Sequence, residues 1–297
     1  MKRTLLIVAL LLASQAALGW GEVGHLMINE AASIEAGPLL PPFFRDAHDR
    51  LIYLGPEPDR WYTGRFETLT AENFPEHFLN YEYVDHLELP ADRYEFLDLL
   101  DQTNTLERFG IGSTRTGFSP WRIAELTERL TVQWRLWRDA KPGPEREQIE
   151  ENIIHLSGVL GHYVGDTSNP LHTTIHYNGW AWAENPAGFR TDCETHARFE
   201  SRFVTRTIET ADVLENMPSF RRRTGFFDTA IVHIREAHGL VVPLYEIDRD
   251  GGFDGEGNEE SRKFAARRLG AGAAMLRDLW ISAYLASEER LATWRTE

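Results

Sequence analysis

The sequence predicts a mostly α fold, a single helical domain with long loops that build a functional site. Apolar residues recur every three or four positions along most of the chain. Strict alternation of apolar and polar residues is almost absent, and Pro and Gly fall between the periodic segments. The chain has 297 residues, 42% of them hydrophobic and 26% charged, which is typical of a globular protein.

The first 19 residues have the pattern of a secretory signal peptide. A basic start precedes an apolar run over 5–13, and small residues lead to a cleavage site after Gly19. The apolar run is too short to span a bilayer as a helix. We therefore expect a secreted or periplasmic protein, not a transmembrane one, whose mature domain covers 20–297 and begins at Trp20.

The first half of the mature chain contains three helical patterns. Residues 24–35 carry apolar side chains at helical spacing, which predicts a buried helix. The segment 92–106 is entered through Pro90 and is also expected to be helical. In 121–139 the apolar residues recur every three or four positions, and the pattern stops before the Lys-Pro-Gly turn at 141–143.

The second half contains four further helical patterns. The first covers 144–166 and ends before Pro170, because proline cannot continue a helix. Thr191 and Asp192 can cap a helix that continues to about residue 207. Two more helices are expected at 227–239 and 261–289. The remaining long segments are candidates for loops that build the site: 52–76, 170–191 and 246–260.

Composition excludes some function classes. The formal net charge of -15 argues against a basic face that holds nucleic acid. An anionic substrate would need local positive charge, which bound metal ions can supply. Cys193 is the only cysteine, so no intramolecular disulfide forms, and we expect a buried, inert thiol. The acidic segment 248–260 does not match the spacing of an EF-hand calcium loop and is expected to be a solvated turn.

Histidine and carboxylate residues form the strongest pattern. His162 and Asp166 lie four residues apart, which puts both on one helix face, and His172 follows shortly after the helix end. His196 and Glu200 repeat the one-turn spacing on the next predicted helix. Imidazole and carboxylate groups together are a natural ligand set for zinc.

The string HYVGDTSNPLH, at residues 162–172, resembles the central motif of the zinc-dependent phospholipase C and single-strand-specific nuclease superfamily. The resemblance extends over nearly the whole mature chain and begins with WGEVGH at residues 20–25. Members are secreted, mostly helical proteins that hold three zinc ions in a cleft. The resemblance therefore implies a hydrolase that cleaves phosphodiester bonds by attack of a zinc-bound hydroxide.

The resemblance also implies which residues bind the three zinc ions. Trp20 would bind through its α-amino nitrogen and carbonyl oxygen once the signal peptide is removed, and Asp166 would bridge two ions. Asp59 would also orient the attacking water, as the catalytic residue. The implied ligands are, for the first ion, Asp59, His77, His162 and Asp166; for the second, Trp20, His25 and Asp166; and for the third, His172, His196 and Glu200.

Asp59 and His77 are assigned by the likeness of Pro58-Asp59-Arg60-Trp61 and Glu76-His77-Phe78 to the family pattern. Other residues in the same region could serve as ligands instead. These alternatives are His48, Asp85 and His86. His155, one heptad before His162, is expected to support the ligands or to lie in the core.

The substrate-binding residues differ from those of both branches of the superfamily. Tyr62 stands where the nucleases have an arginine, so Arg60 or Arg65 would have to replace it. Asn80 stands where the nucleases read a base with an aspartate, and Phe78 remains available to stack a base. The short gap between Trp20 and His25 favours a nuclease, whereas Glu200 is the phospholipase choice.

The favoured function is a nuclease acting on single-stranded DNA or RNA, and on 3′-nucleotides. The first alternative is a phospholipase C that hydrolyses phospholipid head groups, with an aromatic rim from the loop 177–182. The second alternative is a catalytically inactive zinc-binding homologue. No stable protein partner is implied.

Overall fold

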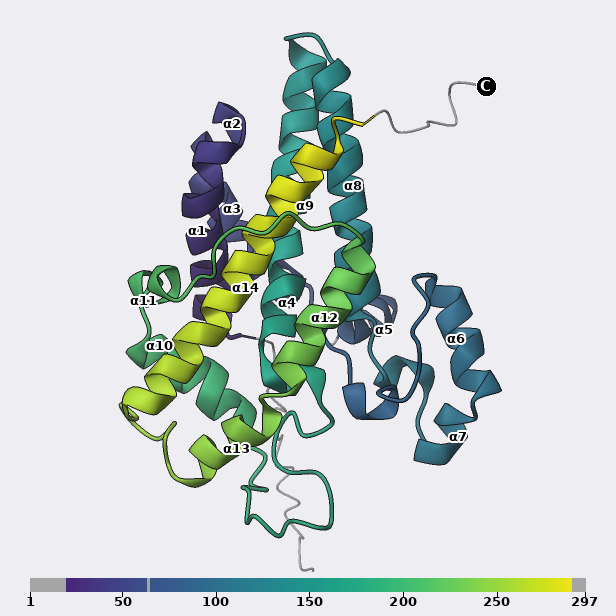
Figure 1. Ribbon diagram of the computed structural model, residues 1–297, viewed down its shortest axis with the longest axis vertical. Helices are drawn as coiled ribbons and strands as arrows, with labels where there is room; N and C mark the ends of the chain where they lie inside the picture. The colour runs from purple at the N-terminus through teal and green to yellow at the C-terminus, as the bar shows by residue number, and fades with distance from the viewer. Residues whose placement is uncertain (1–19, 63–64, 290–297) are drawn as a thin grey trace, which may run out of the picture.

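Two long helices, α8 (Ser119–Asp139) and α9 (Pro144–Ser168), form an antiparallel pair at the centre of the fold (Figure 1). The C-terminal helix α14 (Glu259–Ala286) crosses this pair and contacts both members. Helix α1 (Glu22–Ala36) packs against α9 and α14. These four helices bury most of the apolar core, and they carry three of the residues expected to bind metal.

The computed structural model describes residues 20–62 and 65–289. Within these ranges the chain is one mostly helical domain without β-strands, so the predicted fold class is confirmed. None of the helices in the described ranges is long and apolar enough to cross a bilayer. The expected signal peptide, 1–19, lies outside the described residues.

The other helices are short and surround the central four. They are α2 (Pro42–Asp46), α3 (His48–Leu54), α4 (Glu57–Arg60), α5 (Glu67–Asn73), α6 (Arg93–Gln102), α7 (Thr105–Phe109), α10 (Val204–Thr207), α11 (Thr210–Glu215), α12 (Phe226–His238) and α13 (Val241–Arg249). Single 3₁₀ turns occur at η1 (Gly37–Leu39), η2 (Phe74–His77), η3 (Tyr81–Tyr83), η4 (Ser113–Arg115) and η5 (Pro170–Thr173). The segment η6 (Ala197–Phe203) is a π-helix.

Helix α9 starts and ends where its sequence requires. Pro144 occupies the first turn after Gly143, and acidic residues follow, as the helix dipole favours. Its glycines allow α1 to approach closely. A Cβ at Gly161 would lie 1.9 Å from Oδ1 of Asn29 on α1. The Asn29 amide donates to the carbonyls of Leu51 and Gly158, at 2.7 and 3.0 Å, which joins α1, α3 and α9.

Two apolar clusters form the interior. The larger one lies among α1, α8, α9 and α14 and contains the fully buried Trp134 and Trp280. The smaller one packs α6 and α12 against the start of α8, with Phe96 stacked on Trp121 at a ring distance of 4.3 Å. The smaller cluster therefore supports the segment that connects η2 to α8, which forms one side of the functional site.

Several sequence expectations are corrected by the structure. The helix expected at 92–106 is divided between α6 and α7, because Asn104 adopts a left-handed backbone with φ of 52°. The loop expected at 52–76 contains α4 and α5. The helix expected at 191–207 forms only from about residue 195 and is mostly a π-helix.

Two side-chain predictions are also wrong. Cys193 is exposed and not buried, because it lies in a loop turn with a positive φ of 59° before the π-helix. His155 is exposed on the outer face of α9, away from the ligand residues. Neither residue supports the site.

Candidate metal centre

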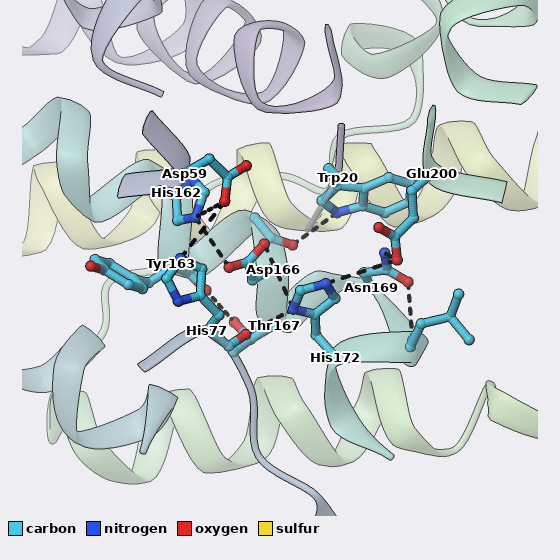
Figure 2. Close-up of polar contacts among 12 residues, drawn as sticks. Trp20, Asp59, His77, His162, Tyr163, Asp166, Thr167, Asn169, His172 and Glu200 are labelled. Atoms are coloured by element: carbon cyan, nitrogen blue, oxygen red, sulfur yellow. Dashed lines mark hydrogen bonds and ion pairs between the residues drawn. The ribbon is translucent and has the colours of Figure 1, made fainter. Parts of the chain in front are cut away.

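Eight of the nine expected ligands contribute side chains to three groups in which the ligand atoms lie within 4.8 Å of one another. The first two groups named below share His162, and all three lie side by side along the end of α9, where Figure 2 shows Asp59 and His77 to one side of Asp166 and His172 and Glu200 to the other. The groups are His25, His162 and Asp166; Asp59, His77 and His162; and His172, His196 and Glu200. Each group could hold a metal ion.

The first group joins α1 to α9. His162 and Asp166 lie one turn apart on α9, with Nε2 and Oδ2 separated by 3.4 Å. His25 on α1 brings its Nε2 to 3.3 Å from the other carboxylate oxygen, Oδ1. The rings of His25 and His162 stack at 4.0 Å. The two oxygens of Asp166 therefore face two different imidazoles. All three side chains are fully buried.

The second group adds residues from two short elements. Asp59 lies on α4, and its Oδ1 is 3.4 Å from Nε2 of His162. His77 ends η2, and its Nε2 is 3.8 Å from the same oxygen. Oδ2 of Asp59 is directed toward His25, at 4.0 Å. Asp59 therefore lies between the first and second groups.

The third group lies where the chain leaves α9. His172 is part of η5, directly after the proline that ends α9. His196 and Glu200 lie at the start of the π-helix, with Nε2 and Oε1 separated by 2.6 Å. Nε2 of His172 lies 3.2 Å from Nε2 of His196. The amide of Asn169 donates to Oε1 of Glu200 at 2.7 Å, a contact that the sequence analysis missed.

The spacing of the donor atoms fits metal coordination. Two ligands bound tetrahedrally at zinc distances are separated by roughly 3.4 Å. The Nε2-to-oxygen distances in the first two groups, between 3.3 and 4.0 Å, bracket that value. Most of these separations are too long for good hydrogen bonds. Buried atoms that reach no hydrogen-bond partner include Nε2 of His25, His77 and His162, and both oxygens of Asp166.

Backbone carbonyls determine which ring nitrogen of each histidine is free to bind. Nδ1 of His162 faces the carbonyl of Gly55 at 3.0 Å, and Nδ1 of His77 faces that of Asn73 at 2.8 Å. Nδ1 of His172 faces the carbonyl of His77 at 2.9 Å. A carbonyl can only accept, so Nδ1 carries the proton and Nε2 keeps its lone pair. This arrangement is typical of histidines that bind metals.

Burial without a counter-ion favours the neutral forms of these groups. Desolvation raises the pKa of Asp166 to about 8, although His172 opposes the shift. Desolvation also raises the pKa of Glu200 to about 8 and that of Asp59 to about 7. Desolvation lowers the pKa of His25 to about 4 and that of His77 to about 3. A bound divalent cation favours ionised carboxylates and neutral imidazoles, so it would relieve the cost of burying the acids.

Trp20 is fully buried beside α9. Its indole Nε1 donates to the carbonyl of Gly165 at 2.8 Å and to Oγ of Ser168 at 3.0 Å. The ring also packs against Phe199 of the π-helix at 5.2 Å. These contacts hold Trp20 against the last turn of α9, where Gly165 and Ser168 flank Asp166. Metal binding by its backbone stays a prediction.

The residues considered as alternative ligands lie outside the three groups. Nδ1 of His48 is 2.7 Å from Oγ of Ser33. Asp85 and His86 are exposed and pair with each other at 3.2 Å. Asp59 and His77, in contrast, lie together with His162 in the second group.

A pocket opens beside the second and third groups. Three of the histidines, His77, His172 and His196, form part of its wall. The other lining residues are Tyr62, Phe74, Phe78, Asn80, Arg115, Leu171 and Tyr177. Phe78 is half-buried and meets Phe74 edge to face at 5.2 Å. The pocket therefore combines aromatic rings with imidazoles in its lining.

The arginine of this pocket is Arg115, and sequence reasoning missed it. Neither Arg60 nor Arg65 lines the pocket. Arg60 instead pairs with Glu57 at 3.0 Å. Asn80 donates its amide to the carbonyl of Arg115 at 2.7 Å, which fixes the amide orientation. Arg115 lies in η4, 35 residues after Asn80, and no local motif marks it.

A buried ion pair supports the third group from behind. Arg198, in the π-helix between His196 and Glu200, donates to both oxygens of Asp248 at 2.8 and 2.9 Å. Oγ1 of Thr195 also donates to Asp248, at 3.0 Å. Asp248 is fully buried at the end of α13, so this part of the predicted solvated turn is in fact a support for the ligand helix.

No family model matches the sequence, and a comparison with curated proteins finds no match.

Proposed function

We propose that the protein is a secreted zinc-dependent phosphodiesterase of the phospholipase C and nuclease superfamily that cleaves single-stranded nucleic acid. One observation carries the proposal. His77, His172 and His196 belong to the ligand groups and also line the aromatic pocket. A phosphodiester bound at these histidines would therefore have its neighbouring base beside aromatic rings.

The pocket chemistry supports a nucleobase as the adjacent group. Stacking of a base on an aromatic ring contributes about 1–3 kcal/mol, and Phe78 and Tyr177 offer rings to the pocket. Because the amide nitrogen of Asn80 is engaged by the Arg115 carbonyl, its oxygen is left to accept from an amino group on a base edge. Arg115 can pair with a flanking phosphate.

The chain's own residues would prepare the reaction. Zinc bound at the three groups would supply Lewis acidity and a water that ionises near neutral pH. Asp59 is 9% exposed at the junction of two groups, where its carboxylate can orient an attacking water and accept its proton. Asn169 holds the Glu200 carboxylate, and the carbonyls at Nδ1 hold three histidine rings in place.

The first test is hydrolysis by the purified protein that begins at Trp20, supplied with zinc. We expect cleavage of single-stranded DNA and RNA and weak action on duplex DNA. Asp59→Asn should lower kcat by about 100-fold or more, because it removes a positioned base. His86→Ala, which removes an exposed imidazole outside the groups, is the matched control and should keep full activity. Hydrolysis of phosphatidylcholine alone would refute the nuclease assignment.

The aromatic pocket has a separate test. Phe78→Leu should raise KM for single-stranded DNA roughly 10-fold with little change in kcat, since one stacking partner is lost. The zinc content of the variant should equal that of the original protein, because Phe78 is outside the ligand groups. An unchanged KM would show that the base does not bind at this ring.

The proposed role of Trp20 can be tested by metal analysis. A protein carrying extra residues before Trp20 has no free α-amino group at that position. We expect it to bind one zinc ion fewer than the protein that begins at Trp20. Equal zinc content in the two proteins would contradict this ligand.

A phospholipase C is the second candidate. The observation in its favour is that Tyr177 and Trp182, in the loop beside the pocket, are 43% and 52% exposed. Exposed aromatic residues at the rim of a site suit the interface of a lipid membrane. Phosphatidylcholine vesicles are the substrate that separates this candidate from the nuclease.

A further inference from the structure

A second cleft, of about 600 Å³, lies away from the three ligand groups. It is formed by α13, the turn at 250–258 and the first turns of α14, which lie together in Figure 1. None of the eight ligand side chains lines it. Its apolar surface includes Pro243 and Phe264, and its polar surface is rich in basic side chains.

Arg268 is a buried lining residue without an anionic partner. The residue is 8% exposed, and its Nε donates to the carbonyl of Ser168 at 2.8 Å. Its Nη2 reaches no hydrogen-bond acceptor in the described part of the chain, and no described carboxylate forms an ion pair with it. Desolvation lowers its pKa to about 10, and only the more distant Glu236 opposes that shift. A buried charge without an anionic partner is costly, and an anion bound in the cleft that Arg268 lines would lower that cost.

Two more cations lie along the same helix. Lys263 and Arg267 also line the cleft, and both are exposed. Neither forms an ion pair with a carboxylate in the ranges that the structure describes. A fourth cation, Arg249, is already paired with Asp250 at 2.7 Å. Three cations without an ion pair therefore line one cleft of a chain whose net charge is -15.

The acidic residues of the cleft do not reach these cations. Glu246 and Glu260 also line it, and both are exposed. Their carboxylates are hydrated and form no ion pair with the described cations. They limit the net positive charge of the cleft, which favours a small ligand over an extended polyanion.

We propose that this cleft binds a small organic phosphate, with the phosphoryl group on Arg268, Arg267 and Lys263 and the organic part against Phe264 and Pro243. A guanidinium presents paired donors that match phosphate oxygens. Three cations suit a dianion better than a single carboxylate. The site is separate from the proposed phosphodiesterase centre and does not depend on it.

Lysine protection tests the proposal at the site itself. Lys141 and Lys263 are the only lysines after residue 19. Both are exposed, and Lys141 lies in the turn between α8 and α9, far from the cleft (Figure 1). The zinc-loaded protein is acylated with a lysine reagent, with and without phenylphosphonate, and modification is measured by peptide mass spectrometry. We expect at least threefold slower acylation of Lys263 at saturation, with Lys141 unchanged.

Variants assign the protection to the proposed cations. Arg268→Gln should abolish it. Arg267→Gln should raise the phenylphosphonate concentration needed for half-maximal protection at least threefold. Because Arg267 is exposed, this variant provides a result even if the first variant does not fold. Arg262→Gln is the matched control, because Arg262 precedes Lys263 but binds the Glu256 carbonyl outside the cleft. It should keep full protection.

Three results would overturn the proposal. The first is equal acylation of Lys263 with and without phenylphosphonate. The second is protection that persists in a folded Arg268→Gln variant. The third is protection by benzoate or by inorganic phosphate equal to that by phenylphosphonate at the same concentration. Equal protection by benzoate would show that no phosphoryl group is needed, and equal protection by inorganic phosphate would show that the apolar surface has no role. Phosphate binding at the metal centre does not affect this measurement, because Lys263 lies outside that pocket.

Discussion

Without bound metal, this protein should become less stable as the pH rises from 7.5 to 9. Asp166 and Glu200 are buried and the Asp59 side chain is only 9% exposed, and desolvation raises the pKa values of Asp59, Asp166 and Glu200 to about 7, 8 and 8. A carboxyl group whose pKa is higher in the folded than in the unfolded state stabilises the fold when protonated. That contribution is present at low pH and is lost as the pH rises through the folded pKa.

The expected loss can be worked out between pH 7.5 and pH 9. Over this interval Asp59 loses only about 0.2 kcal/mol, because its carboxyl group is already mostly ionised at pH 7.5, and Asp166 and Glu200 each lose about 0.8 kcal/mol. The buried histidines barely contribute, because unfolded histidines, with a pKa of about 6.5, are already mostly neutral at pH 7.5. The metal-free protein should therefore lose roughly 2 kcal/mol of unfolding free energy.

Urea unfolding followed by tryptophan fluorescence at 25 °C measures this loss. The metal-free protein is compared at pH 7.5, 8, 8.5 and 9 in the presence of a chelator. The zinc-loaded protein is the control, and its stability should not fall in this way, because metal ligation requires the ionised carboxylates. A free energy of unfolding that stays level or rises with pH in the metal-free protein would show that these acids are not held neutral.

Three further predictions concern single residues. Gly161→Ala should lower the unfolding free energy by about 3 kcal/mol in urea titrations, because the new Cβ would overlap Asn29; an unchanged value would mean that α1 and α9 can separate freely. Asp248→Asn should lower zinc content and kcat in a variant that stays folded, because it weakens the ion pair that holds Arg198 behind the third ligand group, and a folded variant with full zinc content and kcat would contradict this role. Cys193 should react fully with a thiol reagent in the folded protein, as measured by absorbance, whereas slow reaction only in denaturant would contradict its exposure.

The sequence predicted those parts of the fold that depend on local signals. Pro144 and Pro170 bracket α9, so its predicted limits, 144–166, nearly match the observed Pro144–Ser168. The close approach of α1 depends on glycines whose neighbours come from another helix, and no periodicity reveals that. The π-helix at Ala197–Phe203 was also missed, because a helical apolar pattern does not distinguish a π-turn from an α-turn.

In the candidate site, too, local spacing predicted some residues, whereas contacts between distant segments were not predicted. The pair His162 and Asp166 follows from one-turn spacing on a single helix, and the geometry agrees. Asp59 and His77 were assigned by likeness to a family, since spacing alone left His48 and His86 as alternatives. Arg115 and Asn169 were not identified, because each makes its contact with a residue that is distant in sequence; Asn169 lies within the motif at 162–172, but the motif does not indicate that it holds Glu200.

The hydrogen bonds between η2 and η5 have a consequence for how the protein is synthesised. His172 receives a bond from the amide of Leu79 and gives one to the carbonyl of His77, across 95 residues of chain. Every ligand group includes at least one residue from position 162 onward. A ribosome-bound fragment that ends before α9 therefore cannot assemble any of the three groups, and ion uptake must wait until the later half of the polypeptide has emerged.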